Sequence, residues 1–262
     1  MTTQPTYFIP HGGGPCFFMD DQRGVWTGME TFLRNLQAGL PERPKALLVV
    51  SGHWETDGFA FTGSEAPSLI YDYNGFPKHT YELRYDAPGA PALAARAAAL
   101  LSAPGMQARV DPARGLDHGV FVPLKVAFPA ADIPVIEMSV DRNLDPALHL
   151  AAGRALTPLR DEGVLIVGSG MSFHNMRAYG DGRATAPSHA FDQWLTESTA
   201  LAGAARAERL VQWADAPSGR FSHPREEHLL PLMVAAGAAD GPGEQVYSEQ
   251  VLETAISGFR FT

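Results

Sequence analysis

The sequence contains a single cysteine, Cys16, among 262 residues. One thiol cannot form an internal disulfide and cannot supply a zinc site built from several thiolates. A bound metal ion would therefore be held by nitrogen and oxygen ligands. The scarcity of cysteine is also typical of a reducing compartment, so we expect a cytoplasmic protein.

Long apolar runs and positive charge are scarce as well. No apolar segment approaches the roughly 20 residues of a membrane span, and the opening "MTTQPTYFIP" has neither the basic start nor the apolar core of a signal peptide. The chain carries 20 Lys and Arg against 29 Asp and Glu, a formal net charge of -9. Because nucleic acids and anionic membranes bind clustered positive charge, we expect neither as a partner and expect small molecules instead.

Two kinds of apolar pattern alternate along the chain, which predicts an α/β fold. Runs rich in β-branched residues are typical of buried strands and lie at 46–54, 133–140 and 164–170. Helical patterns separate and follow these runs, at 24–40, 90–103, 145–163, 188–216 and 226–239. Two short alternating segments, 245–250 and 255–262, predict a closing hairpin. No repeat or long linker divides the chain, so we expect one domain over residues 1–262.

One segment fits neither pattern. Residues 71–91, "YDYNGFPKHTYELRYDAPGAP", are rich in aromatic side chains and proline and have no regular period. A loop of this composition either covers a binding site or packs over the edge of the core, and the sequence leaves both interpretations open.

Three of the nine histidines follow apolar runs. His11 comes after "YFIP", His53 ends "VVSGHW" and His174 comes shortly after "IVGSG". Ligands of open α/β sheets bind outside the carboxyl ends of the strands. A single histidine at a strand end is more often structural, but three of them predict a shared crevice. Clustered imidazoles suit zinc, iron, copper or nickel, and an open coordination position would make such a site catalytic.

A fourth candidate is His228, which we place in the first turn of the predicted helix 226–239. His223 competes with it but precedes Pro224 in a loop, so a capping or surface role fits it better. Asp117 comes just before His118 and either orients a histidine through its ring N–H or caps the segment that follows. Three further histidines follow no buried strand: His79, His149 and His189. His149 and His189 are interpreted as surface or capping residues, whereas His79 lies in the aromatic loop and could reach a substrate.

Seven motifs, read in order, resemble the class III extradiol ring-cleavage dioxygenases, and more narrowly their DOPA 4,5-dioxygenase branch. They are "PHGGGP", "VVSGHW", "YDYNGFP…YELRYDAPG", "LDHGVFVPL", "IPVIEMSV", "GSGMSFHNM" and "EEHLLPLMVAAGA". Each motif is short, but together they extend from about residue 7 to residue 260. The resemblance implies a single three-layer catalytic domain over residues 1–262, with a central mixed sheet flanked by helices and a divalent metal at the strand ends.

The resemblance also implies roles for individual residues. The metal-binding histidines fall on His11, His53 and His228. His174 matches the acid/base histidine, which is a further ligand in some zinc-bound members, and His118 matches a histidine that lines the pocket and assists catalysis. Rings that stack on the substrate, unless they are plain core, are expected among Trp54, Tyr73, Phe76 and Tyr81.

The implied function is a non-haem, metal-dependent extradiol dioxygenase. It would open the ring of a catechol, a small aromatic diol, and incorporate both atoms of O2. Fe(II) is the expected cofactor, and Zn(II) is the alternative because zinc outcompetes iron at nitrogen ligands. The sequence indicates no oligomeric state.

Two departures from the motifs leave the substrate open. An additional glycine stands before Pro15, and Ser172 and Phe173 replace a more common aliphatic pair. Iron sites of this kind commonly use two histidines and a carboxylate, whereas the matched set here is all histidine. Glu227 is the nearest carboxylate to His228, but adjacent helical positions point about 100° apart, which disfavours both binding one ion.

Two other functions fit the same residues. Memo-type proteins resemble these dioxygenases and are regarded as metal- or partner-binding proteins without ring cleavage. A zinc hydrolase would need only three histidines, an activated water and a proton shuttle. Retention of both the three ligand positions and His174 favours the dioxygenase.

Overall fold

The computed structural model describes residues 2–102 and 106–262, so the last residue of the helix predicted at 90–103 lies outside the described residues. Eight strands form one sheet: β1 (Thr6–Pro10), β2 (Ala46–Thr56), β3 (Phe59–Thr62), β4 (Ala108–Asp111), β5 (Val135–Asp141), β6 (Val164–Gly170), β7 (Gly243–Val251) and β8 (Thr254–Phe261). The helices are α1 (Thr27–Asn35), α2 (Pro91–Leu100), α3 (His118–Ala127), α4 (Pro146–Leu156), α5 (Pro158–Asp161), α6 (Thr185–Thr199), α7 (Gly203–Val211), α8 (Gly219–Ser222) and α9 (Leu230–Gly237).

The sheet is mixed, as expected, with the strand order β4-β3-β5-β2-β6-β1-β8-β7. Strands β5, β2, β6 and β1 run parallel to their neighbours in the centre of the sheet. Strand β8 pairs antiparallel with β1, β7 pairs antiparallel with β8, and β3 runs antiparallel to β5. The carboxyl ends of the four central strands therefore meet along one edge of the sheet.

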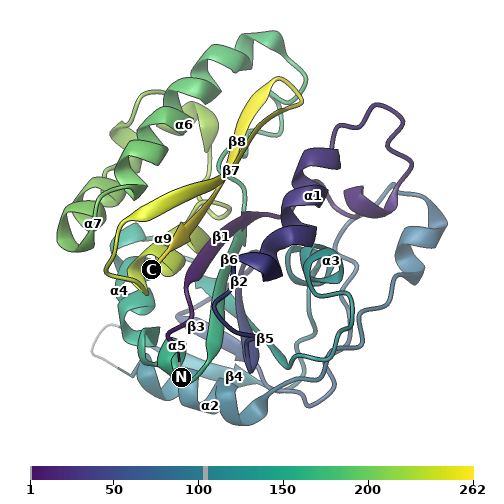
Figure 1. The fold of residues 1–262 in the computed structure, drawn as a ribbon, viewed down its shortest axis with the longest axis vertical. Helices are drawn as coiled ribbons and strands as arrows, with labels where there is room; N and C mark the ends of the chain where they lie inside the picture. The colour runs from purple at the N-terminus through teal and green to yellow at the C-terminus, as the bar shows by residue number, and fades with distance from the viewer. Residues whose placement is uncertain (1, 103–105) are drawn as a thin grey trace.

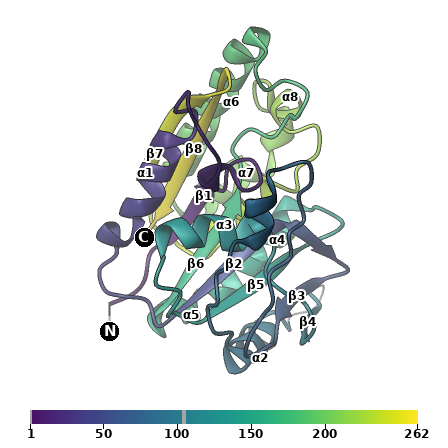
Figure 2. The same cartoon turned by 90° about the vertical axis from the view of Figure 1, so that its right-hand side faces the viewer.

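Helices cover both faces of the sheet and produce three layers (Figures 1 and 2). Successive side chains of a strand point to opposite faces. In β2, Leu48 and Val50 join the apolar cluster that includes α4 and α9, whereas Leu47 and Val49 join the cluster that includes α3 and part of the loop 71–91. Burial on both faces explains why the central strands read as unbroken apolar runs.

Several boundaries differ from the prediction, each for a local reason. The pattern 188–216 divides into α6 and α7 before Gly203, whose φ of +51 is not helical, and the pattern 145–163 divides before Pro158. Strand β2 continues past His53 to Thr56. The predicted hairpin is confirmed as β7 and β8. Strands β3 and β4 and helices α3 and α8 were not predicted; β3 and β4 have only four residues each, and α3 contains Gly119 and Pro123.

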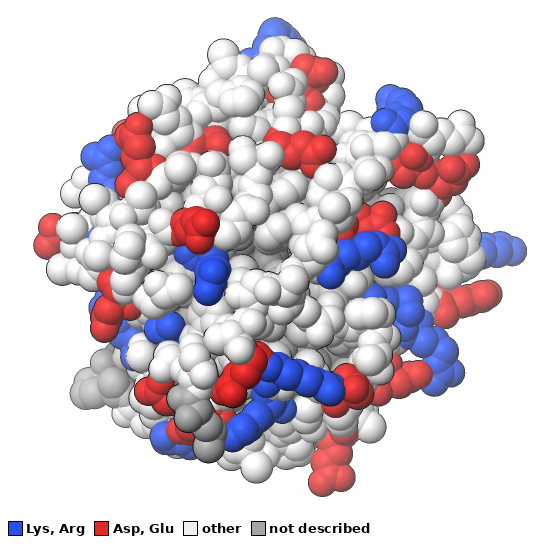
Figure 3. Space-filling view, in the orientation of Figure 1, with Lys and Arg blue, Asp and Glu red and all other residues white. Residues whose placement is uncertain are grey.

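Within the described residues, no helix is both long and apolar enough to cross a membrane. Acidic and basic side chains are interspersed over the face drawn in Figure 3, with uncharged surface between them. That face therefore presents no extended patch of one charge.

Candidate functional site

Five histidines come together at the carboxyl ends of the central strands. Ring centroids lie 5.0 Å apart for His11 and His53, 4.0 Å for His53 and His118, and 4.5 Å for His53 and His228. The ring of His174 stacks on that of His228 with 3.5 Å between centroids. The predicted convergence of His11, His53, His174 and His228 is thus observed, and His118 joins them from the first residue of α3.

A bulge in β2 brings His53 into this group. Pairing of β2 with β6 ends at Ser51, and its pairing with β5 is interrupted between Val50 and Glu55. The Ser51 hydroxyl accepts a hydrogen bond from the His53 backbone N–H at 3.2 Å and donates one to Asp117 Oδ1 at 2.8 Å. A bulge re-aims a side chain that regular pairing would hold on one face of the sheet.

Two glycines allow the chain that carries His228 to lie directly on the sheet. A Cβ atom on Gly52 would stand 2.7 Å from the Glu227 carbonyl oxygen, and one on Gly170 would stand 2.1 Å from the His228 carbonyl oxygen. The same His228 carbonyl accepts a hydrogen bond from the Met171 backbone N–H at 3.0 Å. His228 occupies the turn before α9, two residues ahead of Leu230, so the prediction that it opens the helix is wrong.

Asp72 links two of the histidines. Its Oδ1 accepts from Nδ1 of His118 at 2.8 Å and from the His118 backbone N–H at 2.9 Å, while Oδ2 lies 3.6 Å from Nδ1 of His53. Burial alone would raise the pKa of Asp72, but the hydrogen bonds from His118 lower it to about 2. The carboxylate is therefore charged at neutral pH and fixes Nδ1 as the protonated nitrogen of His118.

Glu227 is the corresponding carboxylate beside His174 and His228. Its Oε1 lies 3.0 Å from Nδ1 of His228 and 3.2 Å from Nδ1 of His174. Burial opposes ionisation of Glu227, but the hydrogen bonds from His174 and His228 lower its pKa well below the ordinary value. The two carboxylates thus hold His118, His174 and His228 by Nδ1, Asp72 also faces Nδ1 of His53, and each ring has Nε2 left for the interior of the site.

His11 follows the same rule with a backbone partner. Its Nδ1 lies 2.9 Å from the Gly12 carbonyl oxygen, which requires the proton on Nδ1. Its Nε2 is buried and has no hydrogen-bond partner within the described part of the chain. Burial, and after it the neighbouring histidines, holds the pKa of His11 well below 6.5, so the ring is neutral. The lone pair of its Nε2 is therefore able to bind a metal ion.

The remaining donor atoms also fit a divalent metal. Nε2 of His53 and Nε2 of His228 lie 3.1 Å apart. Nitrogens bound at about 2.1 Å to one ion are about 3.0 to 3.4 Å apart in tetrahedral or octahedral geometry. Burial lowers the pKa of His53 to about 4 and that of His228 well below 6.5, so both rings are neutral. Two unprotonated nitrogens this close repel each other unless a cation lies between them.

Two triplets of ligand atoms meet the spacing of a metal site within the described residues. In each, the ligand atoms lie within 4.8 Å of one another: His11, His53 and His118 in the first, and His174, Glu227 and His228 in the second. Because the rings of the two triplets pack against each other in one cluster, the arrangement can hold an ion and leave other histidines unbound. The spare histidines are then available to move protons.

A cavity of about 480 Å³ opens over the histidines. Tyr73 and Phe76 line it from the loop 71–91, so this loop covers the site as well as packing on the core. Trp54 and Tyr81 do not reach the cavity wall: Trp54 is buried with the Arg114 guanidinium 5.0 Å from its ring, and Tyr81 packs behind Tyr73.

The structure places several other polar residues in environments that differ from the predicted ones. Asp117 neither orients a histidine nor caps α3 with its side chain, but pairs with Arg114 at 3.0 Å. His149 and His223 are fully buried, so the surface interpretation is wrong for both. His149 Nε2 accepts from the Asp141 backbone N–H at 3.1 Å. His79 and His189 are exposed, and neither lines the cavity.

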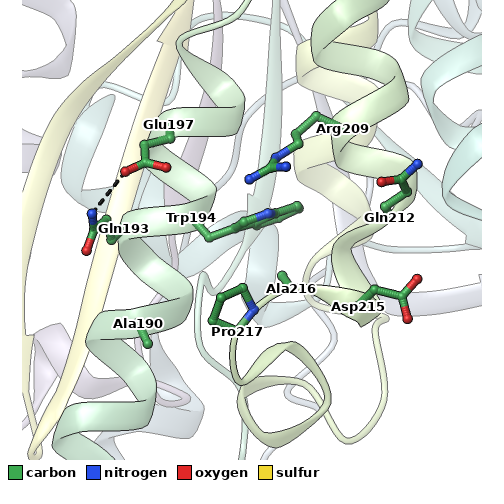
Figure 4. A pocket seen from close by; sticks show the side chains of 9 residues that line it. All are labelled: Ala190, Gln193, Trp194, Glu197, Arg209, Gln212, Asp215, Ala216 and Pro217. Carbon is green, nitrogen blue, oxygen red and sulfur yellow. Dashed lines mark hydrogen bonds between the residues drawn. The ribbon is translucent and has the colours of Figure 1, made fainter.

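A second cavity, of about 410 Å³, lies between α6 and α7 and contains none of the histidines (Figure 4). Its floor is Trp194, toward which the Arg209 side chain points, with the guanidinium 5.3 Å from the ring centroid. Gln193 donates to Glu197 at 2.9 Å. Gln193 is thus paired with Glu197, and Arg209 with Trp194. Because the described residues of this cavity include no cluster of metal ligands, the functional site is the histidine cavity.

Comparison with known proteins agrees with this choice. Residues 5–259 match the family model described as the catalytic LigB subunit of aromatic ring-opening dioxygenase. The chain belongs to this family. It is an extradiol ring-cleaving dioxygenase, and the expectation of an α/β enzyme of this class is confirmed.

Individual relatives extend over most of the chain. A 4,5-DOPA dioxygenase extradiol from Beta vulgaris is 42% identical over 238 residues, which cover 89% of this chain and 86% of the relative. The dioxygenase tasH from Hapsidospora irregularis is 39% identical over 261 residues, covering 91% of this chain and 79% of the relative. The crystal structure of an uncharacterized protein from Escherichia coli superposes with a TM-score of 0.79 at 30% identity and covers 99% of this chain and 100% of that one.

Proposed function

We propose that this dioxygenase opens the ring of a catechol at a divalent metal ion held by His11, His53 and His228. The observation that carries the proposal is the set of neutral imidazoles whose Nε2 atoms converge below an aromatic cavity. Fe(II) is the metal we expect for activity. Bound there, the ion would orient the diol and O2 and acidify the diol hydroxyls.

His174 is proposed as the acid/base residue. Its Nδ1 proton is directed at Glu227, so Nε2 is the atom that takes a proton from a diol hydroxyl and later returns one. The stacked ring of His228, 3.5 Å away, fixes the orientation of His174. His118 would assist from the opposite side, where Asp72 holds it in the same tautomer.

Aromatic side chains are proposed to hold the substrate ring. Tyr73 lies 5.7 Å from the ring of His118, nearly perpendicular to it, and Phe76 packs edge-on against Tyr73. A planar ring above the histidines would therefore meet aromatic surface on the loop side. Tyr81 supports Tyr73 from behind, and Trp54 supports the Arg114 and Asp117 pair rather than the substrate.

A reducing compartment suits this function. The one thiol, Cys16, is buried, and burial raises its pKa to about 12, so it forms no thiolate at neutral pH. We propose the cytoplasm as the location, because it is a reducing compartment in which Fe(II) stays reduced. Cell fractionation followed by immunoblotting of the untagged protein would test this location.

The test is reconstitution of the purified protein with Fe(II) under anaerobic conditions, followed by oxygen uptake with a panel of catechols. We expect uptake of one O2 per catechol and growth of a yellow ring-opened product, both abolished in His11→Ala and His174→Ala. Zn(II)-loaded protein serves as the control and should take up no O2. No uptake by fully iron-loaded protein with any catechol would reject the proposed pairing of Fe(II) with a catechol substrate.

A further inference from the structure

Among the described residues, the wall of the histidine cavity includes no Lys, Arg, Asp or Glu side chain. Apart from the histidines, three glycines and Asn74, its lining residues are apolar, aromatic or sulfur-containing: Cys16, Met19, Trp26, Tyr73, Phe76, Met171, Met176, Tyr179 and Leu252. The two nearby carboxylates, Asp72 and Glu227, are directed at the histidines and lie behind them. A charged group on the substrate would therefore lose water without gaining a partner.

The hydroxyl groups of the two tyrosines in the wall do not make the cavity more polar. The Tyr73 hydroxyl donates to the Thr80 carbonyl oxygen at 2.5 Å, and the Tyr179 hydroxyl donates to the Phe173 carbonyl oxygen at 2.6 Å. Both polar tips are thus used within the protein, and the rings present carbon to the cavity. Of the described side chains outside the histidine cluster, the uncharged polar groups in the wall are the Asn74 amide, the Trp26 indole N–H and the Cys16 thiol.

The apolar wall continues to the mouth of the cavity. Trp26, Leu252 and Met171 belong to one apolar cluster that includes the turn of the β7–β8 hairpin. Met176 lies at the rim with 69% of its surface exposed, which is unusual for a large apolar side chain. A neighbouring cavity of about 460 Å³ shares Cys16, Met19, Trp26 and Leu252 with the first, and its lining also includes Asp20, Asp21 and Arg23.

The volume also exceeds what the diol ring needs. A cavity of about 480 Å³ is in the range that encloses ligands much larger than one six-membered ring. Because the diol must face the histidines, a ring substituent away from the diol meets the part of the wall outside the histidine cluster, which includes Trp26, Met176 and Leu252. That part of the wall decides which substituent binds.

We propose that the substrate is a catechol whose ring carries an uncharged, apolar substituent of several carbons, seated against Trp26, Met176 and Leu252. This inference rests on the proposed catechol chemistry of the same site. It distinguishes the chain from an enzyme selective for an amino acid or carboxylate side arm, which would need a cation or an ammonium-binding carboxylate in the wall.

The test compares arms that share a three-carbon chain from the ring and differ in charge: 4-propylcatechol, 3-(3,4-dihydroxyphenyl)propionate and the methyl ester of that acid. With Fe(II)-loaded protein we expect kcat/KM for the two neutral catechols to exceed that for the acid by about tenfold or more, mainly through KM. DOPA should behave like the acid. An acid or DOPA turned over as well as 4-propylcatechol would overturn the inference and leave the ring-opening function standing.

Calorimetric titration of Zn(II)-loaded protein with the same three catechols separates the two proposals. If no catechol is opened but the neutral ones still bind about tenfold more tightly than the acid, the ring-opening proposal fails and the apolar pocket stands. Equal dissociation constants for all three would overturn the pocket.

A cation placed on the wall tests the position of the substituent. Met176→Lys should raise kcat/KM for the acid relative to 4-propylcatechol by about tenfold, because the ammonium pairs with the carboxylate. Met176→Gln is the matched control, polar and uncharged, and should not favour the acid. Because Met176 is exposed, neither change disturbs the core. The same preference in Met176→Lys as in the parent would place the substituent elsewhere and overturn the assignment.

Discussion

Asp72 accepts hydrogen bonds from both the ring Nδ1 and the backbone N–H of His118, and its second oxygen faces Nδ1 of His53. One carboxylate from an irregular loop thereby sets the orientation of a histidine on β2 and a histidine on α3. This dual contact places Asp72 beside both the proposed metal ligand His53 and the proposed proton-transfer residue His118.

Asp72→Asn should weaken metal binding by about 10- to 100-fold and lower kcat/KM in parallel, because an amide holds only one of the two imidazoles by its oxygen. Metal affinity is measured by competition with a chelator, independently of turnover. Asp86→Asn is the matched control in the same loop, since the Asp86 side chain is 68% exposed and pairs only with Arg84. Equal metal affinity and equal kcat/KM in the two variants would show that Asp72 does not position the histidines.

The choice between ligand sets is tested by two parallel substitutions. We expect His228→Asn to lose the metal, whereas His118→Asn should keep it and lose about 10²- to 10⁴-fold in kcat as a proton-transfer group is removed. Metal content by mass spectrometry and single-turnover kinetics give the two readouts. Loss of the metal from His118→Asn with retention in His228→Asn would assign the ion to His11, His53 and His118 instead.

The glycine motif after β1 predicts a contrast between neighbours. Gly14 has a φ of +55, and a Cβ there would lie 2.9 Å from the Phe76 ring, whereas a Cβ on Gly13 would make an ordinary 3.6 Å contact with Trp26. Gly14→Ala should cost about 1 kcal/mol or more in unfolding free energy and raise KM by displacing Phe76. Gly13→Ala should fold like the parent. Thermal melting and steady-state kinetics measure the two effects. Equal melting temperatures and equal KM values for the two variants would contradict the prediction.

The buried His223 predicts an acid-sensitive stability. Burial lowers its pKa to about 3, and its Nε2 donates to the Ser172 carbonyl oxygen at 3.0 Å. Because the unfolded chain takes up this proton near pH 6.5, the stability is full above that pH and is lost as the pH falls toward 3, by about 1.4 kcal/mol per pH unit. Urea denaturation at pH 7 and pH 5 should show a smaller loss in His223→Gln than in the parent. An identical loss would mean that His223 is not neutral in the folded protein.

The histidines at the strand ends could be predicted from the sequence because each follows a run whose period and length mark a buried strand. His11, His53 and His174 needed only the rule that such strands open onto a shared crevice. The metal and the proton-transfer roles remain predictions, since spacing along the chain does not define which Nε2 atoms bind one ion.

The carboxylates that orient the histidines could not be predicted in the same way. Asp72 lies in a loop without a period, and its contact with His118 depends on how that loop packs over α3. Glu227 was considered as a ligand, but it is the hydrogen-bond acceptor of His174 and His228. The burial of His149 and His223 was missed for a related reason: a polar side chain in a helix or loop carries no signal of the partner that lets it lie inside.

The glycine contacts beneath His228 have a consequence for biosynthesis. His53 and His228 are separated by 175 positions, and the backbone of the later segment lies on strands completed long before it is translated. A nascent chain therefore carries most of its histidines without a complete centre until nearly all of it has left the ribosome. The proposed metal site of His11, His53 and His228 is complete only in the finished chain, so we expect metal loading to be a late step and a truncated product to bind the ion less tightly.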